Sequence, residues 1–227
     1  MQLRLAFKKM GMIKFISHLD TIRVFTRAIQ RAEIPVLWSA GFNPHQKLSI
    51  AQPLSVGMES EFEVLDLEVE DDYDIGVLKE AINRELPEGL EVTDVTKDFD
   101  PTSVFERIRK TEYRLFFPSK FYPEASVLKD VVEEAMKREE ILVGRRKKHK
   151  KKRIIVQEDI KPGILSMRWA EEEDGVALYA VLQAGGYGNL RPDRFLKGVF
   201  ETSDIDIDYI QIRRMKSWDG ENREVQL

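Results

Sequence analysis

The chain has 227 residues, of which 42% are hydrophobic and 33% are charged, and its formal net charge is −4. These proportions exclude a chain that is disordered throughout. The absence of cysteine excludes disulfide bonds, thiolate catalysis and a cysteine-ligated cluster in this chain. No apolar run reaches the ~18 residues of a membrane span, and the N-terminus does not read as a signal peptide. We therefore expect a cytoplasmic protein without membrane contact.

The first half of the chain alternates predicted strands and helices. Ser17 is the expected N-cap of a helix, with Asp20 at its third position, and Pro35 lies beyond the end of that helix. A second helix is predicted from Asp74 to about Leu86. Alternating apolar residues predict strands at 3–7, 12–16, 36–40, 47–51, 62–70 and 90–95.

The second half repeats this order. Helical spacing predicts a helix at 124–139, and Pro192 is expected at the first position of another, PDRFLKGVF. Strands are predicted at 112–117, 164–169, 175–183 and 205–215, the second and third forming a hairpin around an acidic turn. The Asp- and Pro-containing segment 98–103 reads as a domain boundary.

The order of elements predicts an α+β fold with two tandem ferredoxin-like (βαββαβ) domains. We expect the first domain at residues 1–98 and the second at 104–227. Residues 141–161 interrupt the second domain between its first helix and the hairpin. Because IIV (154–156) follows the cations of this insertion, we expect it to form a basic β-arm.

The stretch RRKKHKKKR (145–153) carries eight positive side chains in nine residues. Without these eight charges the net charge of −4 would be −12, so an acidic body bears one intensely basic segment. Such mutual repulsion is best offset by a polyanion such as the phosphate backbone of a nucleic acid, although a solvated loop without a ligand is the simpler alternative. The predicted nucleic-acid contacts are Arg145, Arg146, Lys147, Lys148, Lys150, Lys151, Lys152 and Arg153.

The first predicted helix adds an arginine stripe. Arg23, Arg27 and Arg31 recur every four residues and share one helix face, so we include Arg23 and Arg27 among the nucleic-acid contacts. An ordinary solvated helix face would show the same pattern.

Two of the three histidines stand beside turn or helix signals. His18 follows the Ser17 cap, and His45 lies in the turn GFNPHQ. We expect both imidazoles to line one cleft of the first domain and treat them as candidate catalytic residues. The alternative is that they only fix two loops. The predicted cleft consists of His18, Asp20, Asn43, His45 and Lys47, and we expect no metal or cofactor in it.

A glycine-rich segment, GGYGNLRP, leads from a predicted strand into a helix. Its backbone N–H groups suit an anion, although a flexible connector is an equal alternative. The predicted anion loop consists of Gly185, Gly186, Gly188 and Arg191.

Three segments carry a family resemblance. KFISHLDTIRVFTRAIQRAEIPV, SAGFNPHQKLSIAQPLSVGMESE and GNLRPDRFLKGVF resemble a bacterial radical SAM-linked family, a domain of unknown function. The resemblance implies a B12-type radical SAM protein fused to the domain or encoded beside it, and a genomic setting of RNA processing and ribosomal proteins. The order of the domains is also similar to the RNA-binding and RNA-cleaving proteins of CRISPR systems, a likeness of fold alone.

The sequence leaves three functions open. The first is an RNA-binding module, for tRNA or rRNA, that assists a radical SAM partner enzyme and has no activity of its own. The second is a metal-independent ribonuclease of the repeat-associated type, in which the two histidines exchange protons with the RNA. The third is a module that docks the radical SAM partner without binding RNA.

Overall fold

The computed structural model describes residues 1–149 and 152–227; at residues 146–149, 152 and 153 it describes the backbone alone. The chain is a mixed α+β protein with mostly antiparallel strands, and it divides into two compact units. Unit 1 contains residues Met1–Ile108 and Arg213–Leu227, and unit 2 contains Arg109–Ile212. This division differs from the predicted domains at 1–98 and 104–227, because the end of the chain belongs to unit 1.

Unit 1 is built on an antiparallel sheet in the order β4-β1-β3. Its strands are β1 (Gln2–Lys9), β3 (Met58–Glu68) and β4 (Leu90–Thr96). A short strand, β2 (Leu48–Ile50), pairs with β3, and β10 (Gln211–Trp218) is also a neighbour of β3.

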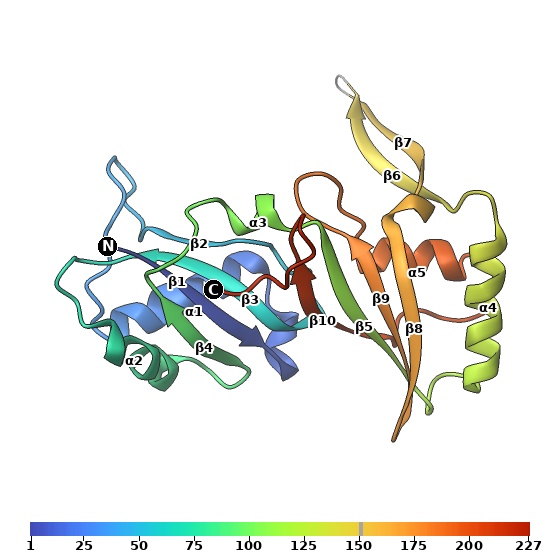
Figure 1. Cartoon of the computed structure of the whole chain (residues 1–227), viewed down its shortest axis with the longest axis horizontal. Coiled ribbons are helices and arrows are strands. Elements are labelled where there is room, and N and C mark those ends of the chain that lie inside the picture. The colour runs from blue at the N-terminus through green and yellow to red at the C-terminus, as the bar shows by residue number, and fades with distance from the viewer. Residues whose placement is uncertain (150–151) are drawn as a thin grey trace. The chain divides into compact units, whose positions relative to one another are not determined.

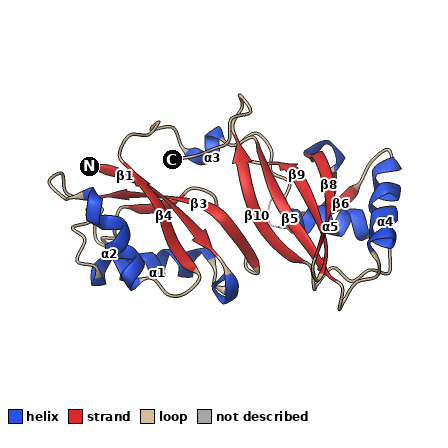
Figure 2. Cartoon of the chain, turned by 60° about the horizontal axis from the view of Figure 1, so that its bottom comes forward, coloured by secondary structure: helices blue, strands red, loops and turns tan. Residues whose placement is uncertain are grey.

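Two helices, α1 (His18–Arg31) and α2 (Leu78–Glu85), lie on one face of the unit 1 sheet (Figure 2). The Ser17 hydroxyl caps α1 by accepting from the Asp20 backbone N–H at 3.1 Å, which confirms the predicted helix start. The core between sheet and helices includes Leu3, Leu5, Phe7, Phe25, Ile29, Leu65, Leu67, Leu78 and Ile82.

Two predicted strands of unit 1 are wrong. Residues Gly11–Phe15 form a short 3-10 helix, because Gly11 adopts a left-handed backbone (φ 65°) that breaks the extended chain. Segment 36–40 forms only isolated bridges, Val36 with Val69 and Trp38 with Gln46. Two further short turns of helix are η2 (Ile75–Val77), capped by Asp74, and α3 (Val104–Arg107).

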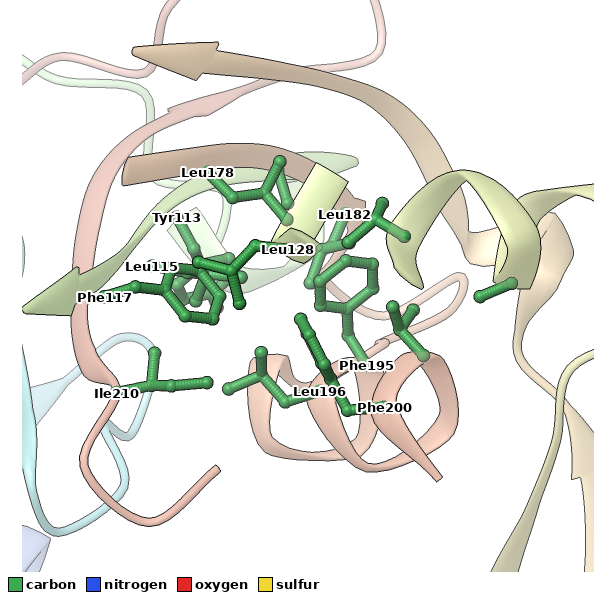
Figure 3. Packing of buried hydrophobic residues seen from close by; sticks show 14 of the residues in the cluster. Tyr113, Leu115, Phe117, Leu128, Leu178, Leu182, Phe195, Leu196, Phe200 and Ile210 are labelled. Atoms are coloured by element: carbon green, nitrogen blue, oxygen red, sulfur yellow. The ribbon is translucent and has the colours of Figure 1, made fainter. Parts of the chain in front are cut away.

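Unit 2 has an antiparallel sheet in the order β5-β9-β8. Its strands are β5 (Lys110–Pro118), β8 (Ile164–Glu172) and β9 (Gly175–Gln183), and the predicted β8–β9 hairpin is confirmed. The helices are α4 (Ala125–Lys137) and α5 (Pro192–Phe200), which starts at the predicted proline, with a 3-10 turn at Lys161–Gly163. Figure 3 shows side chains of both helices meeting those of β5 and β9 in the core.

The predicted basic arm is a two-stranded antiparallel ribbon of its own. It consists of β6 (Leu142–His149) and β7 (Lys152–Asp159), and it projects from unit 2 (Figure 1). The expected β-arm is therefore confirmed as secondary structure.

The final strand begins later than predicted. Segment 205–209 alternates in polarity like a strand, but the Asp206 carboxylate accepts from the Asp208 N–H at 2.9 Å and holds a turn instead. β10 accordingly starts at Gln211. Within the described residues no helix has the length and apolarity that crossing a membrane requires.

Candidate functional site

The ribbon of unit 2 presents the greatest density of positive charge in the sequence. Arg145 pairs with Val156 and Arg146 with Ile155, and the pairing continues to His149 and Lys152. The side chains of the predicted contacts from Arg146 to Arg153, namely Arg146, Lys147, Lys148, Lys150, Lys151, Lys152 and Arg153, lie outside the described residues. The Arg145 side chain is described, and it is about half exposed, 3.4 Å from Glu158.

The base of the ribbon is fastened to unit 2 by hydrogen bonds. One carboxylate oxygen of Asp159 accepts from the backbone N–H of Ile141 at 2.9 Å and of Lys161 at 3.0 Å. The Ile160 N–H donates to the Ile141 carbonyl at 2.9 Å. These bonds join the residue before β6 to the end of β7 and the residues after it. The two strands are therefore held together where they begin to project from unit 2.

Apolar packing fixes the same point. Ile141, Val143 and Ile160 are buried in the unit 2 core. Gly198 of α5 faces them so closely that an added Cβ would lie 2.7–2.8 Å from their side chains. Because a larger residue would not fit, glycine at this position lets the helix approach the base of the ribbon.

Beside the ribbon base lies a hollow of about 130 Å³ lined by Glu158, Asp159, Gly188, Asn189 and Arg194 among others. Arg194 forms an ion pair with Glu158 at 3.2 Å, and among the described residues its buried Nε finds no hydrogen-bond acceptor. Of the predicted anion loop, Gly188 lines this hollow.

The other members of the predicted anion loop are not in this hollow. Gly185, Gly186 and Arg191 are absent from its lining. Arg191 instead pairs with Asp193 at 2.9 Å in an exposed position, which neutralises it locally. The sequence prediction missed Arg194, which lies three residues after Arg191, the N-cap residue of α5.

The arginine stripe of α1 is largely neutralised. Arg23 pairs with Asp20 at 2.6 Å, and Arg31 pairs with Glu85 at 2.8 Å. Hydrogen bonds from Ser17 and Arg23 hold the pKa of Asp20 below its usual value. Arg27 is exposed. The stripe therefore offers less positive charge to a phosphate than the sequence predicted.

A polar cleft of about 380 Å³ opens in unit 1 on the face of the sheet away from α1 and α2. Side chains alternate between the two faces of a strand, and Leu65 and Leu67 pack in the helix-covered core. Asp66 and Glu68 therefore point to the opposite face, where both line this cleft, which we call the sheet-face cleft. Its lining comprises Gln2, Arg4, His45, Lys47, Leu48, Ser49, Asp66, Leu67, Glu68, Phe99 and Pro101.

Arg4 is the buried cation of the sheet-face cleft. It is opposite Asp66 in the strand register, and its guanidinium donates to both carboxylate oxygens, at 2.7 and 3.1 Å. It also donates to the Asp100 carbonyl at 3.1 Å and lies 4.3 Å from the centre of the Phe99 ring. The side chain is 2% exposed, so these contacts replace the water it has lost.

His45 stands in a loop that is closed by its own hydrogen bonds. The Ser39 N–H donates to the His45 carbonyl at 2.8 Å, and the His45 N–H donates to the Ser39 hydroxyl at 3.0 Å. That hydroxyl also lies 2.8 Å from Nδ1 of the ring. Nδ1 is thereby engaged within the loop, and Nε2 is the ring nitrogen left for a ligand.

Two predicted cleft residues, His45 and Lys47, do line the sheet-face cleft; Lys47 is 2.7 Å from Glu68. His18 does not: it lines a separate small hollow with Phe7, Lys9, Thr21 and Glu63. Phe7 belongs to the helix-covered core, so the sheet separates the two histidines. The single cleft predicted from the sequence is therefore wrong.

The remaining members of the predicted cleft are Asp20 and Asn43. Asp20 accepts hydrogen bonds from Ser17 and Arg23 at the start of α1, and Asn43 is exposed in the loop before His45. Neither lines the sheet-face cleft. The residues that the sequence missed are Arg4, Asp66, Glu68 and Phe99; the polar face of the alternating strand 62–70 was a signal for two of them.

The hollow at His18 contains a buried ion cluster instead of a ligand site. Glu63, 2–3% exposed, accepts from Arg214 at 2.7 Å, and Lys9 donates to the Ile16 carbonyl at 2.9 Å. Burial lowers the pKa of Lys9, and the charge of Glu63 partly opposes that shift. The space left is about 10 Å³, which is at most room for one water molecule.

These features define a mixed α+β protein with a cationic β-ribbon in one unit and a polar sheet-face cleft in the other. The chain belongs to the family described as an uncharacterized protein conserved in bacteria (DUF2344), whose model matches residues 2–192. The matched range includes the ribbon and the residues that line the sheet-face cleft.

The other comparisons add no argument about function. No curated protein matches the chain. Among solved structures, a chain in the crystal structure of a Cbf5-Nop10-Gar1 complex is similar over 95% of this chain, with 13% sequence identity and a TM-score of 0.42. This chain spans 50% of the length of that one.

Proposed function

We propose that this protein binds RNA through the β6–β7 ribbon. The observation that carries the proposal is a projecting two-stranded ribbon with eight cations in residues 145–153, fastened at its base by Asp159. A solvated loop would not need such a fixed base. A ribbon that must present its charges to a ligand does need one, because a fixed base reduces the entropy lost on binding.

The chemistry of the ribbon favours phosphate over bases. Lysine and arginine neutralise phosphates and release the counterions condensed on the nucleic acid, and this contribution does not depend on sequence. Phosphate contacts position a protein on a nucleic acid, whereas contacts with base edges select the sequence. The ribbon accordingly supplies affinity and position, and selectivity has to come from elsewhere in the protein.

The family resemblance supports a narrower version of the proposal. In it, the RNA is tRNA or rRNA in the cytoplasm, and the protein presents it to a radical SAM enzyme encoded nearby. Because this chain has no cysteine, the iron–sulfur cluster would belong to that partner.

We also propose that each unit has a ferredoxin-like fold. In unit 1 it is supported by the order β4-β1-β3 with β2 beside β3, and by two helices on one face. In unit 2 it is supported by the order β5-β9-β8 with α4 and α5 in the core.

The experiment compares two variants with equal charge changes. The first replaces three ribbon lysines, Lys147, Lys148 and Lys150, with glutamine; the control replaces three exposed lysines elsewhere, Lys97, Lys120 and Lys197. Affinity for a single-stranded RNA is measured by fluorescence anisotropy between 50 and 300 mM salt, roughly the range in which phosphate contacts are lost. We expect the slope of log K against log salt to fall by about 2 in the ribbon variant, at about 0.7 per lost contact.

Equal slopes in both variants would show that the ribbon does not contact phosphate and would overturn the proposal. The control variant removes the same net charge, so a general electrostatic effect would lower both slopes together.

The positions of the two histidines do not fit a ribonuclease that uses both of them. Transfer of protons to and from one phosphodiester needs both imidazoles within hydrogen-bond reach of it. His18 and His45 line separate hollows on opposite faces of the unit 1 sheet, so they do not meet this requirement.

Docking of the radical SAM partner is a second candidate function, and one observation favours it. Met12, Phe15, Leu19 and Val56 of unit 1 are each more than half exposed. The Gly57 N–H donates to the Lys14 carbonyl at 2.9 Å, and this bond joins the loop of Val56 to the 3-10 helix that contains Met12 and Phe15. Partner surfaces are enriched in such methionine and aromatic side chains.

The test for docking is co-purification with the radical SAM protein after nuclease treatment and at high salt. We expect Phe15→Ser with Leu19→Ser to abolish it, while Phe121→Ser, at a comparably exposed phenylalanine of unit 2, leaves it unchanged. Retention by the double variant would eliminate this surface.

A further inference from the structure

The sheet-face cleft has the size of a site for one small ligand. Ligand pockets span about 300–1,000 Å³, and the cleft, at about 380 Å³, lies near the lower limit. Its wall holds an aromatic ring, Phe99, beside charged and amide side chains. A planar ligand with hydrogen-bonding groups along its edge fits this combination better than a purely apolar or purely anionic ligand.

The charges within the cleft determine which edge would be recognised. Three N–H groups of the buried Arg4 donate to Asp66 and Asp100, and Lys47 donates to Glu68. Glu68 uses Oε2 for Lys47, and among the described residues no hydrogen bond reaches its Oε1. Glu68 therefore offers a ligand a free acceptor, because an ionised carboxylate accepts hydrogen bonds and donates none.

Among nucleobases, guanine offers two neighbouring donors, N1–H and the N2 amino group, on its pairing edge. Adenine, cytosine and uracil each offer only one donor position there. A carboxylate matches two adjacent donors with its two oxygens, and because each oxygen has two lone pairs, Glu68 Oε2 can accept from a base while it keeps Lys47. An unpaired base can be read in this way on its Watson–Crick edge.

The loop beside the cleft carries a second signal. Phe42 is fully exposed, at 106%, in the loop whose far end is His45. The Ser39–His45 bonds and Pro44 hold this loop, so the ring is presented on a defined support and not on a free chain end. Exposed aromatic rings in RNA-binding proteins stack on unpaired bases.

We infer that the sheet-face cleft takes one unpaired guanine of a single-stranded RNA, with Glu68 accepting from its pairing edge, and that Phe42 stacks on a neighbouring base. The inference rests on the proposed RNA-binding function and adds the base selectivity that the ribbon lacks. His45 Nε2 and Lys47 are the groups placed to contact the sugar or phosphate of the same nucleotide.

The test uses two labelled pentaribonucleotides, UUGUU and UUAUU, and the full chain in fluorescence anisotropy. We expect UUGUU to bind about tenfold more tightly, the lower part of the range for a good two-point base contact. Glu68→Gln should remove the preference, because its amide places a donor against the donors of guanine. Glu70→Gln, at an exposed carboxylate close by with the same charge change, should retain it.

The stacking contact is tested with the same oligonucleotides. Phe42→Ala should weaken both by about fivefold or more and leave their ratio unchanged. Phe121→Ala, at an exposed phenylalanine of unit 2, is the matched control and should weaken neither.

Equal affinity of the native protein for the two oligonucleotides overturns the guanine assignment, as does a loss of preference in Glu70→Gln. Unchanged binding by Phe42→Ala overturns the stacking contact. The ribbon variant separates this inference from the proposed function: with the ribbon lysines replaced, the salt slope should fall for a long single-stranded RNA, while the ratio of the two pentaribonucleotide affinities persists. A retained ratio with an unchanged slope would refute the ribbon and leave the cleft.

Discussion

The β6–β7 ribbon and the sheet-face cleft use charge in opposite ways. In the ribbon, like charges accumulate over 145–153 far beyond what the neighbouring carboxylate Glu158 can balance. In the cleft, each of the two cations has its own carboxylate, Arg4 with Asp66 and Lys47 with Glu68. The first arrangement is suited to a polyanion, and the second is suited to a neutral ligand recognised by its edge.

The two arrangements also differ in the distance over which their charges act. An excess of charge acts over about a Debye length, roughly 10 Å at 0.1 M salt, and weakens as salt is added. The charges of paired groups cancel at a distance, so such groups act on a ligand only by direct hydrogen bonds, which depend on geometry. Within one chain, then, one region can supply affinity and another discrimination.

The largest loss of stability is expected for a substitution of Asp66 in the sheet-face cleft. Asp66→Ala leaves Arg4 buried without its carboxylate, and removal of one partner of a buried ion pair typically costs about 3–5 kcal/mol. Because Asp66 itself is 38% exposed, we expect about 2–3 kcal/mol. Urea unfolding measures this change.

On the ribbon, Arg145→Gln breaks an exposed pair and should cost under about 1 kcal/mol. An Asp66 variant as stable as the native protein would show that the cleft charges are not structurally coupled.

The next largest loss of stability is expected at the base of the ribbon. Gly198→Ala forces a Cβ against Ile141, Val143 and Ile160, and overpacking of this kind costs about 1–3 kcal/mol. We expect lower stability of unit 2 with an unchanged salt slope for RNA, because no charge is altered. Lys197→Ala, one position earlier and exposed, is the stability control. If the variant is still folded under the conditions of the binding experiment but binds RNA more weakly, the packing at Gly198 also orients the ribbon.

Acid should weaken the paired charges of unit 1. Burial acts to raise the pKa of Glu59, but the hydrogen bond and charge of Arg213, with Lys14 and the Gly11 N–H, hold it below the usual 4.5. A carboxyl with a lowered folded pKa adds stability above its unfolded value, and that stability is lost as pH falls through the folded pKa. Below about pH 4.5 we therefore expect declining stability of unit 1.

Glu59→Gln should flatten this decline, by an amount on the order of 1 kcal/mol after allowance for solvent screening. Chemical unfolding at pH 7, 5, 4 and 3, values that bracket the titration of a carboxyl group, tests the comparison. Parallel pH profiles of the native protein and the variant would rule out Glu59 as the source.

The smallest effect is at Ser39. Ser39→Ala removes the hydroxyl that accepts from the His45 N–H and contacts its ring. Since the loop is exposed, we expect less than about 1 kcal/mol of destabilisation. Exchange of the His45 amide hydrogen with solvent, followed by NMR, should become faster because the amide loses its acceptor. Unchanged exchange would show that another group holds the loop closed.

Several local features could be predicted from the sequence because their causes lie within a few residues. Ser17 caps α1, Pro192 opens α5, and the hairpin of β8 and β9 turns where glycine and acidic residues interrupt the alternation. The position and β-ribbon form of the basic arm follow from the same local logic. Two local signals gave wrong predictions: Gly11 turns segment 12–16 into a 3-10 helix, and Asp206 replaces the start of the predicted strand 205–215 by a turn.

The candidate site was predicted only in part, because it depends on the register of distant strands. Arg4 meets Asp66 across 62 residues of sequence, and nothing near either residue indicates the other. A shift of one residue in that register would move Asp66 and Glu68 to the opposite face of the sheet. The sequence thus determined the helices, the hairpin and the charge of the ribbon. Only the tertiary structure separated His18 from His45, because the face on which a side chain lies depends on pairing between strands far apart in the chain.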